Sequence, residues 1–153
     1  MRPPLSFFVV GLPKGQPRAK ACRFGNVSRV YDPGTADEWK MFVRDAANKA
    51  WDKVPWMGPL CVNATIYFPR PKSHSNKKGL KPDAPKFHTS KPDRDNCDKA
   101  ILDALTNLGI WKDDSQVADG SIRKLYAPDG FQSGAQIEIK ECEYADLTTD
   151  KTG

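Results

Sequence analysis

The amino-acid sequence predicts an α+β fold: a single small domain of 153 residues, with a mixed β-sheet and two main helices. Two observations lead to this prediction. Several stretches have the alternation or the β-branched and aromatic content of strands, and two longer stretches repeat apolar residues at helical spacing. Their order along the chain is β-β-β-α-β-loop-α-β-β, with no internal repeat and no sign of a domain boundary.

The first elements are a strand and a basic segment. "LSFFVVG", residues 5–11, is β-rich and ends at Gly11, as expected for a strand. Residues 12–34 carry five basic side chains, with Gly25-Asn26 between two short stretches. A basic hairpin and a solvated surface loop explain this segment equally well.

A helix and a strand follow. Residues 35–51 are expected to form a helix in which Thr35 and Glu38 have the spacing of a capping box. Its buried stripe is expected to contain Trp39, Phe42, Val43, Ala46 and Ala50. Residues 58–70 read as a strand, and one face of it should carry Leu60, Val62, Ala64, Ile66 and Phe68.

Residues 69–92 form a long, strongly basic loop in this prediction. The segment holds six lysines and Arg70 against one acid, Asp83, so its net charge of +6 exceeds the +5 of the whole chain. It has five prolines and no periodicity. We interpret it as a loop that binds a polyanion; the alternative is a loop that only increases solubility. We expect His74 and His88 to be solvent-exposed.

The C-terminal third begins with an amphipathic helix at 95–108, whose apolar stripe is followed by Gly109 as a left-handed cap. Residues 115–125 are expected to form a strand. Residues 134–144 alternate, with Ala135, Ile137 and Ile139 on one side. The tail, 145–153, is expected to be frayed.

Charge and cysteine content restrict the function classes. The net charge of +5 and pI of about 9.0 point weakly to a polyanionic partner. The four cysteines form no CxxC pair, so we expect reduced thiols and no zinc site. The apolar run "LSFFVV" is too short for a membrane span, and we therefore expect a soluble, cytoplasmic protein with no membrane partner.

Four aspartates lie on either side of the apolar stripe of the second helix: Asp93 and Asp95 at its start, Asp113 and Asp114 after its end. One acid could cap the helix, and the second pair could form a turn. Together these explanations are weaker, because adjacent carboxylates repel each other unless a positive charge lies between them. A Mg²⁺ or Mn²⁺ ion satisfies this requirement, since these ions prefer oxygen ligands.

Lys99 lies four residues after Asp95, on the same face of the helix. It could hold a ligand carboxylate or contact a phosphate, although a plain surface ion pair is the simpler explanation. A cation-binding acidic cluster directly after a basic loop is the arrangement of a metal-dependent nuclease.

The stretch "KPDRDNCDKAILDALTNLGIWKDDSQV", residues 91–117, resembles the signature of the RusA family of Holliday-junction resolvases. The surrounding "GQPRAK" and "YFPRPKSH" also fit, so the resemblance covers most of the chain. It implies a RusA-like homodimeric endonuclease that needs Mg²⁺ or Mn²⁺, uses no small-molecule cofactor, and cuts four-way DNA junctions in recombination and repair. Members are often of phage or prophage origin.

The resemblance also implies roles for individual residues. Asp93, Asp95 and Asp114 would be metal ligands, Lys99 the essential lysine, and Asp113 an auxiliary ligand. We expect Asp98 to face solvent. Candidate DNA-backbone contacts are Lys14, Arg18, Lys72, Lys77, Lys78 and Lys91.

Two alternatives to a junction resolvase stay open. One is another structure-specific, metal-dependent nuclease acting on flaps or single strands, and the other is a non-catalytic DNA-binding module. A geometric question also stays open. The second helix is roughly 20 Å long, and Asp114 follows six residues after its end. Either "GIWKD" returns the chain sharply to the first acids, or a dimer partner completes the site.

Overall fold

The computed structural model describes residues 1–17, 20–24, 27–31 and 34–143, and it describes side chains outside residues 18–33. The elements occur in the predicted order: β1 (Leu5–Val10), β2 (Lys20–Phe24), β3 (Val27–Tyr31), α1 (Asp37–Ala50), β4 (Leu60–Phe68), β5 (Ser75–Asn76), β6 (Gly79–Leu80), α2 (Arg94–Leu108), β7 (Val117–Tyr126) and β8 (Gly134–Glu141). Short 3-10 turns, Lys72–His74 and Asp114–Gln116, precede β5 and β7.

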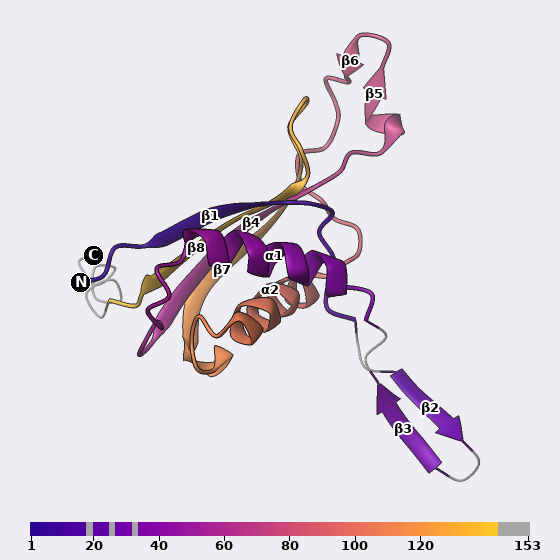
Figure 1. Ribbon diagram of the computed structural model, residues 1–153. Coiled ribbons are helices and arrows are strands. Elements are labelled where there is room, and N and C mark those ends of the chain that lie inside the picture. Colours follow the sequence, from indigo (N-terminus) through magenta and orange to yellow (C-terminus); the bar gives the residue numbers. More distant parts are fainter. Residues whose placement is uncertain (18–19, 25–26, 32–33, 144–153) are drawn as a thin grey trace, which may run out of the picture.

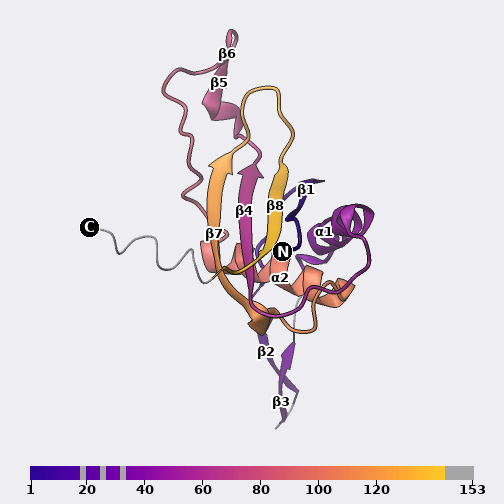
Figure 2. The same cartoon turned by 90° about the vertical axis from the view of Figure 1, so that its left-hand side faces the viewer.

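The main sheet has the strand order β1-β8-β4-β7. Strand β8 pairs antiparallel with both β1 and β4, whereas β4 and β7 are parallel, so the predicted mixed sheet is confirmed. Parallel neighbours need a crossover connection. Here the connection from β4 to β7 runs through residues 69–92 and α2. Figure 2 shows α2 crossing behind the strands rather than running along them.

The core lies between the sheet and the two helices, which are on the same side of it in Figure 1. Alternate residues of β4 point into this core, and all five predicted positions, Leu60, Val62, Ala64, Ile66 and Phe68, are buried. The predicted inward face of β8 is likewise confirmed. Helix α2 contributes the stripe that its sequence predicts, and Gly109 ends it with a positive φ of 85°.

Helix α1 differs from the prediction at both ends. Its N-cap is Ala36 rather than Thr35, and no side chain caps it, so the predicted capping box is wrong. The backbone N–H of Asp37 instead donates to the carbonyl of Gly34, which replaces the side-chain acceptor. At the other end Ala50 is exposed, because the helix ends there.

Residues 69–92 are more ordered than the predicted loop, and we call them the basic arm. Its return limb pairs with the edge of β7, where the N–H of His88 donates to Lys124 O at 2.9 Å and the N–H of Tyr126 to Lys86 O at 2.9 Å. The His88 ring stacks on Phe68 with 3.8 Å between ring centroids. Both histidines of the arm are half-buried, so their expected exposure is wrong.

The outer part of the basic arm and the β2–β3 hairpin project in opposite directions, with α2 between them (Figures 1 and 2). Antiparallel pairing of β2 with β3 confirms the hairpin interpretation. The predicted turn, Gly25-Asn26, and the tail 145–153 lie outside the described residues. In the described chain, no helix combines the length and the apolar character that crossing a membrane requires.

Candidate active site

Asp93 occupies the N-cap position of α2, but its carboxylate makes no capping hydrogen bond. The N–H of Cys97 bonds to the backbone carbonyl of Asp93 at 3.1 Å, so the backbone alone starts the helix. The side chain is exposed. The capping explanation therefore leaves the Asp93 carboxylate without a structural task, and it can serve as a ligand.

Asp95 and Asp98 line one groove between the first turns of α2 and the first half of β7. The groove has a volume of about 430 Å³, and residues 117–122 form its other wall. Burial and the charge of Asp114 raise the pKa of the Asp98 carboxyl, while Arg94 opposes this shift. Asp98 is half-buried, so the expectation that it faces solvent is wrong. The crossing of α2 over β7 directs this face of the helix into the groove.

Asp114 lies close to α2 although it follows the helix by six residues. Burial raises the pKa of its carboxyl, with further contributions from the charges of Asp113 and Asp103, whereas Lys99 lowers it. These couplings place Asp114 within electrostatic reach of the middle of α2. The turn that carries Asp114 contacts α2, but the charge of Asp114 acts on Asp98, Lys99 and Asp103 rather than on Asp93 and Asp95. Whether the same chain or a dimer partner completes the acidic site therefore stays a prediction.

Asp113 has a structural role. Its carboxylate accepts a 2.9 Å hydrogen bond from Ser115 N and forms a capping box with Gln116, whose Oε1 accepts from Asp113 N at 3.1 Å. The hydrogen bond from Ser115 lowers the pKa of Asp113. The turn explanation thus holds for Asp113, which leaves Asp114 as the acid of this pair that is not used by the cap.

Lys99 is exposed on α2 and has no carboxylate of the described residues within 4.0 Å. The surface ion pair with Asp95, which was the simpler explanation for its spacing, is therefore not formed. Its charge acts instead on Asp114, from the segment after the helix. Among the described residues, no carboxylate pairs with the Lys99 ammonium.

The donor atoms of the site fit a hard cation. In the described part of the chain no three His, Cys, Asp or Glu side chains lie close enough to enclose a metal ion by themselves. Mg²⁺ does not need such a cage, because it keeps several waters and binds through one or two carboxylates and phosphate oxygens. Burial raises the pKa of the neighbouring Cys97 thiol to about 11, so the thiol is protonated near neutral pH in the metal-free protein.

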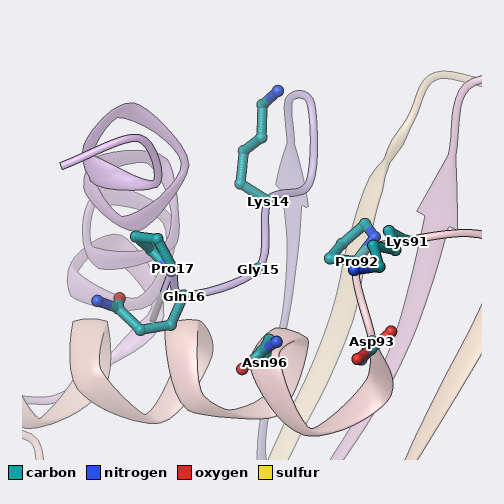
Figure 3. Close-up of a pocket in the computed structure, with 8 residues that line it drawn as sticks. All are labelled: Lys14, Gly15, Gln16, Pro17, Lys91, Pro92, Asp93 and Asn96. Carbon is teal, nitrogen blue, oxygen red and sulfur yellow. The ribbon is translucent and has the colours of Figure 1, made fainter. Parts of the chain in front are cut away.

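Asp93 also borders a second groove, on the other side of the α2 N-terminus, which Figure 3 shows. Lys14 and Lys91, two of the predicted DNA contacts, line it. The other lysines, Lys72, Lys77 and Lys78, are exposed on the basic arm, away from this groove. Arg18 lies outside the described residues.

Two features of the site were not predicted. Asp98 follows Asp95 by three residues, so helical spacing alone would have placed both on one face. Lys40 is only 8% exposed, and it precedes the buried Val43 and Ala47 by three and seven residues. That spacing was a signal of burial, but a lysine is not normally read as part of an apolar stripe.

Comparison with known proteins identifies the family of the chain. Residues 11–140 match the family described as "Endodeoxyribonuclease RusA". The chain is also 36% identical over 126 residues to "Uncharacterized protein YqaN" of Bacillus subtilis (strain 168), a match that covers 80% of this chain and 88% of the relative. The matched region contains the grooves, α2 and the 3-10 turn of Asp114. The chain therefore belongs to the RusA family of endodeoxyribonucleases.

Proposed function

We propose that this protein is a Mg²⁺-dependent endodeoxyribonuclease that resolves four-way DNA junctions by hydrolysing one phosphodiester in each of two opposed strands. Mn²⁺ substitutes for Mg²⁺. The reaction serves DNA recombination and repair in the cytoplasm of a bacterial or phage-infected cell. Membership of the RusA family supports the nuclease class. The junction substrate and the metal are what the family resemblance implies, and the acidic side chains at both ends of α2 are compatible with such a metal.

One observation carries the proposal. The 3-10 turn Asp114–Gln116, which follows α2 in the sequence, contacts that helix, and the charge of Asp114 acts on Asp98 in its first turns. The second acidic segment therefore lies beside the helix that begins with Asp93 and Asp95. A purely structural use of the acids would not require this proximity, because Asp113 alone forms the cap of the 3-10 turn.

The roles of the side chains are part of this proposal. Asp93, Asp95 and Asp114 supply the carboxylates for the cation, although no three described acidic side chains enclose a metal ion as they lie here, so binding has to draw them together. Lys99 faces the phosphate to be cut. When bound, Mg²⁺ stabilises the negative charge that develops on this phosphate. The Lys99 ammonium, which has no carboxylate of the described residues within 4.0 Å, adds a second positive charge there. Lysines of the basic arm hold the strands by their phosphates.

A homodimer fits the substrate. A four-way junction presents two equivalent strands, and a protein with two-fold symmetry presents two equivalent sites to them. In this proposal each protomer contributes one Asp93, Asp95 and Asp114, so a dimer carries two equivalent sites.

The test compares four DNA substrates, a synthetic immobile junction, a flap, a linear duplex and a single strand, with and without Mg²⁺. We expect symmetric nicks in the junction only when the metal is present. Asp95→Asn should reduce nicking at least about 100-fold while junction binding persists. Asp45→Asn, an exposed acid of α1, is the matched control and should nick normally.

The other outcomes identify the alternatives. Preferential cutting of the flap or the single strand would indicate a different structure-specific nuclease. Binding without cleavage in any divalent metal would indicate a non-catalytic DNA-binding module. Unchanged nicking by Asp95→Asn would remove the proposed mechanism even if the junction were the substrate.

A further inference from the structure

The groove in Figure 3 opens directly beside the proposed metal site. One wall is the segment Lys14–Pro17, which leads from β1 towards the β2–β3 hairpin. The other wall is the start of α2, where Asp93 and Asn96 line the groove. Its volume is about 510 Å³, larger than that of the groove holding Asp95 and Asp98. Asp93 therefore connects the acidic site to a second binding space.

Two lysines lie on opposite walls of this groove. Lys14 belongs to the first wall and Lys91 to the second, and both are exposed. In the described part of the chain, neither ammonium has a carboxylate within 4.0 Å. Among the described residues that line the groove, Asp93 is the one acid, and the proposed metal would neutralise it. The groove therefore presents positive charge that no described side chain pairs.

The wall that carries Lys14 is held in a fixed position. The N–H of Gln16 donates to the backbone carbonyl of Asn96 at 2.8 Å, which ties the segment to α2. The side chain of Gln16 accepts a 2.8 Å hydrogen bond from the buried ammonium of Lys40 in α1. A Cβ added to Gly15 would lie 2.6 Å from Pro92 Cβ, so this close approach requires glycine.

We propose that this groove binds a phosphodiester of the DNA backbone next to the one that is cut, with Lys14 and Lys91 as its cationic contacts. The inference rests on the proposed function, because it assigns a subsite to the same DNA strand. Lys40 and Gln16 are positioning residues: they touch no DNA, but they fix the wall from which Lys14 projects. A prearranged wall reduces the ordering that binding would otherwise require.

Two kinds of anionic phosphate in DNA could bind in this groove: an internal phosphodiester and a terminal 5′-phosphate. The internal diester is favoured by the shape of the groove, since it is lined on two sides and open to solvent, so that a strand can pass through it. The experiment below separates the two sources.

The test is methylphosphonate interference, in which single phosphates of the DNA are made neutral. Binding of each junction is measured by fluorescence anisotropy. Divalent metal is left out, so the result does not depend on cleavage. Each junction carries one neutral phosphate near the crossover. For the wild-type protein we expect one or two positions at which neutralisation weakens binding about three- to tenfold. At these positions Lys14→Gln and Lys91→Gln should lose most of the effect, whereas Lys49→Gln, an exposed lysine of α1, should retain it.

A second experiment uses junctions in which one strand ends at the sensitive position. It compares binding of junctions that carry a 5′-phosphate at this end with binding of junctions that do not. If only the terminal phosphate strengthens binding and internal neutralisation has no effect, the groove is a terminal-phosphate site and the proposal is wrong. The proposal is also wrong if the interference pattern is the same in Lys14→Gln, Lys91→Gln and the wild type, or if no position is sensitive.

These outcomes are distinct from failure of the proposed function. A protein that nicks junctions with Mg²⁺ but shows no lysine-dependent interference keeps its function and loses the subsite. A protein that nicks nothing but shows the interference keeps the subsite and loses the nuclease assignment.

Discussion

Lys40 and Gln16 form a buried hydrogen bond: the Lys40 ammonium in α1 donates to Gln16 Oε1 at 2.8 Å, and the two residues are 8% and 7% exposed. Gln16 in turn bonds through its backbone to Asn96 of α2. The bond thus links α1, through the segment that follows β1, to the helix that carries Asp93 and Asp95. A polar contact in the core supports the walls of the candidate site.

We predict that Lys40→Met lowers the free energy of unfolding by about 1–3 kcal/mol, because it removes the lysine donor of a buried amide oxygen. Urea unfolding measures this change. Lys49→Met, at an exposed position of the same helix, should change stability by less than about 0.5 kcal/mol. Lys40→Met should also weaken the methylphosphonate interference assigned to Lys14. Equal stability of the two variants would contradict the role given to Lys40.

We predict that Gly15→Ala weakens junction binding more than the loss of Lys14 alone does. The new Cβ would lie 2.6 Å from Pro92 Cβ and 3.1 Å from Asn96 Cβ, so the segment must move away from α2. That movement shifts both the wall of the groove and the lysine on it. Binding isotherms of Gly15→Ala and Lys14→Gln make the comparison, and normal binding by Gly15→Ala would mean that the contact is not needed.

We predict that His88 makes the protein less stable as the pH falls. Burial in the stack on Phe68, followed by the charge of Lys124, lowers the pKa of His88 from its usual 6.5. The unfolded chain therefore takes up this proton more readily than the folded chain. The contribution to stability is complete above about pH 6.5 and is lost as the pH falls through the lower, folded-state pKa.

His88→Phe keeps a ring against Phe68 and removes the titrating group. Urea unfolding at about pH 7.5 and about pH 5.5 should show a smaller loss of stability for this variant than for the wild type. If the two proteins lose the same amount, then His88 does not titrate differently in the folded and unfolded chains.

We predict that the basic arm acts through charge. Lys77 and Lys78 are exposed in the turn between β5 and β6. The double variant Lys77→Gln/Lys78→Gln should reduce the slope of log binding constant against log salt concentration by about 2, with unchanged stability. Lys49→Gln should leave the slope unchanged. An unchanged slope in the double variant would show that the arm tip does not contact DNA.

The sequence was sufficient for most of the fold because the periodicities are strong. The alternation in β4 and β8 and the stripe of α2 each identify the face that is buried in the structure. It failed at the start of α1, where a backbone carbonyl from Gly34 replaced the expected Thr35 cap. The prediction of an unpaired loop was also wrong for the basic arm. Residues 86–88 pair with the edge of β7, and this long-range contact cannot be predicted from a local sequence pattern.

The candidate site was predictable in part. The spacing of Asp93, Asp95 and Lys99 around one helix start follows from the sequence alone. The position of Asp114 does not, because it depends on how α2 crosses β7 and on the turn after Gly109. The same crossing brings Asp98 into the groove. Which of these acids bind metal stays a prediction.

The most direct test of the central claim is a Mn²⁺ titration of the DNA-free protein, in which electron paramagnetic resonance detects the free and bound Mn²⁺. The account predicts that Asp95→Asn and Asp114→Asn each weaken Mn²⁺ binding at least about tenfold, and that the double variant is weakened by less than the sum of the two effects, because both acids serve one site. Asp45→Asn should bind as the wild type does. Wild-type Mn²⁺ affinity in Asp114→Asn would contradict the claim that two separated acidic segments form one metal site.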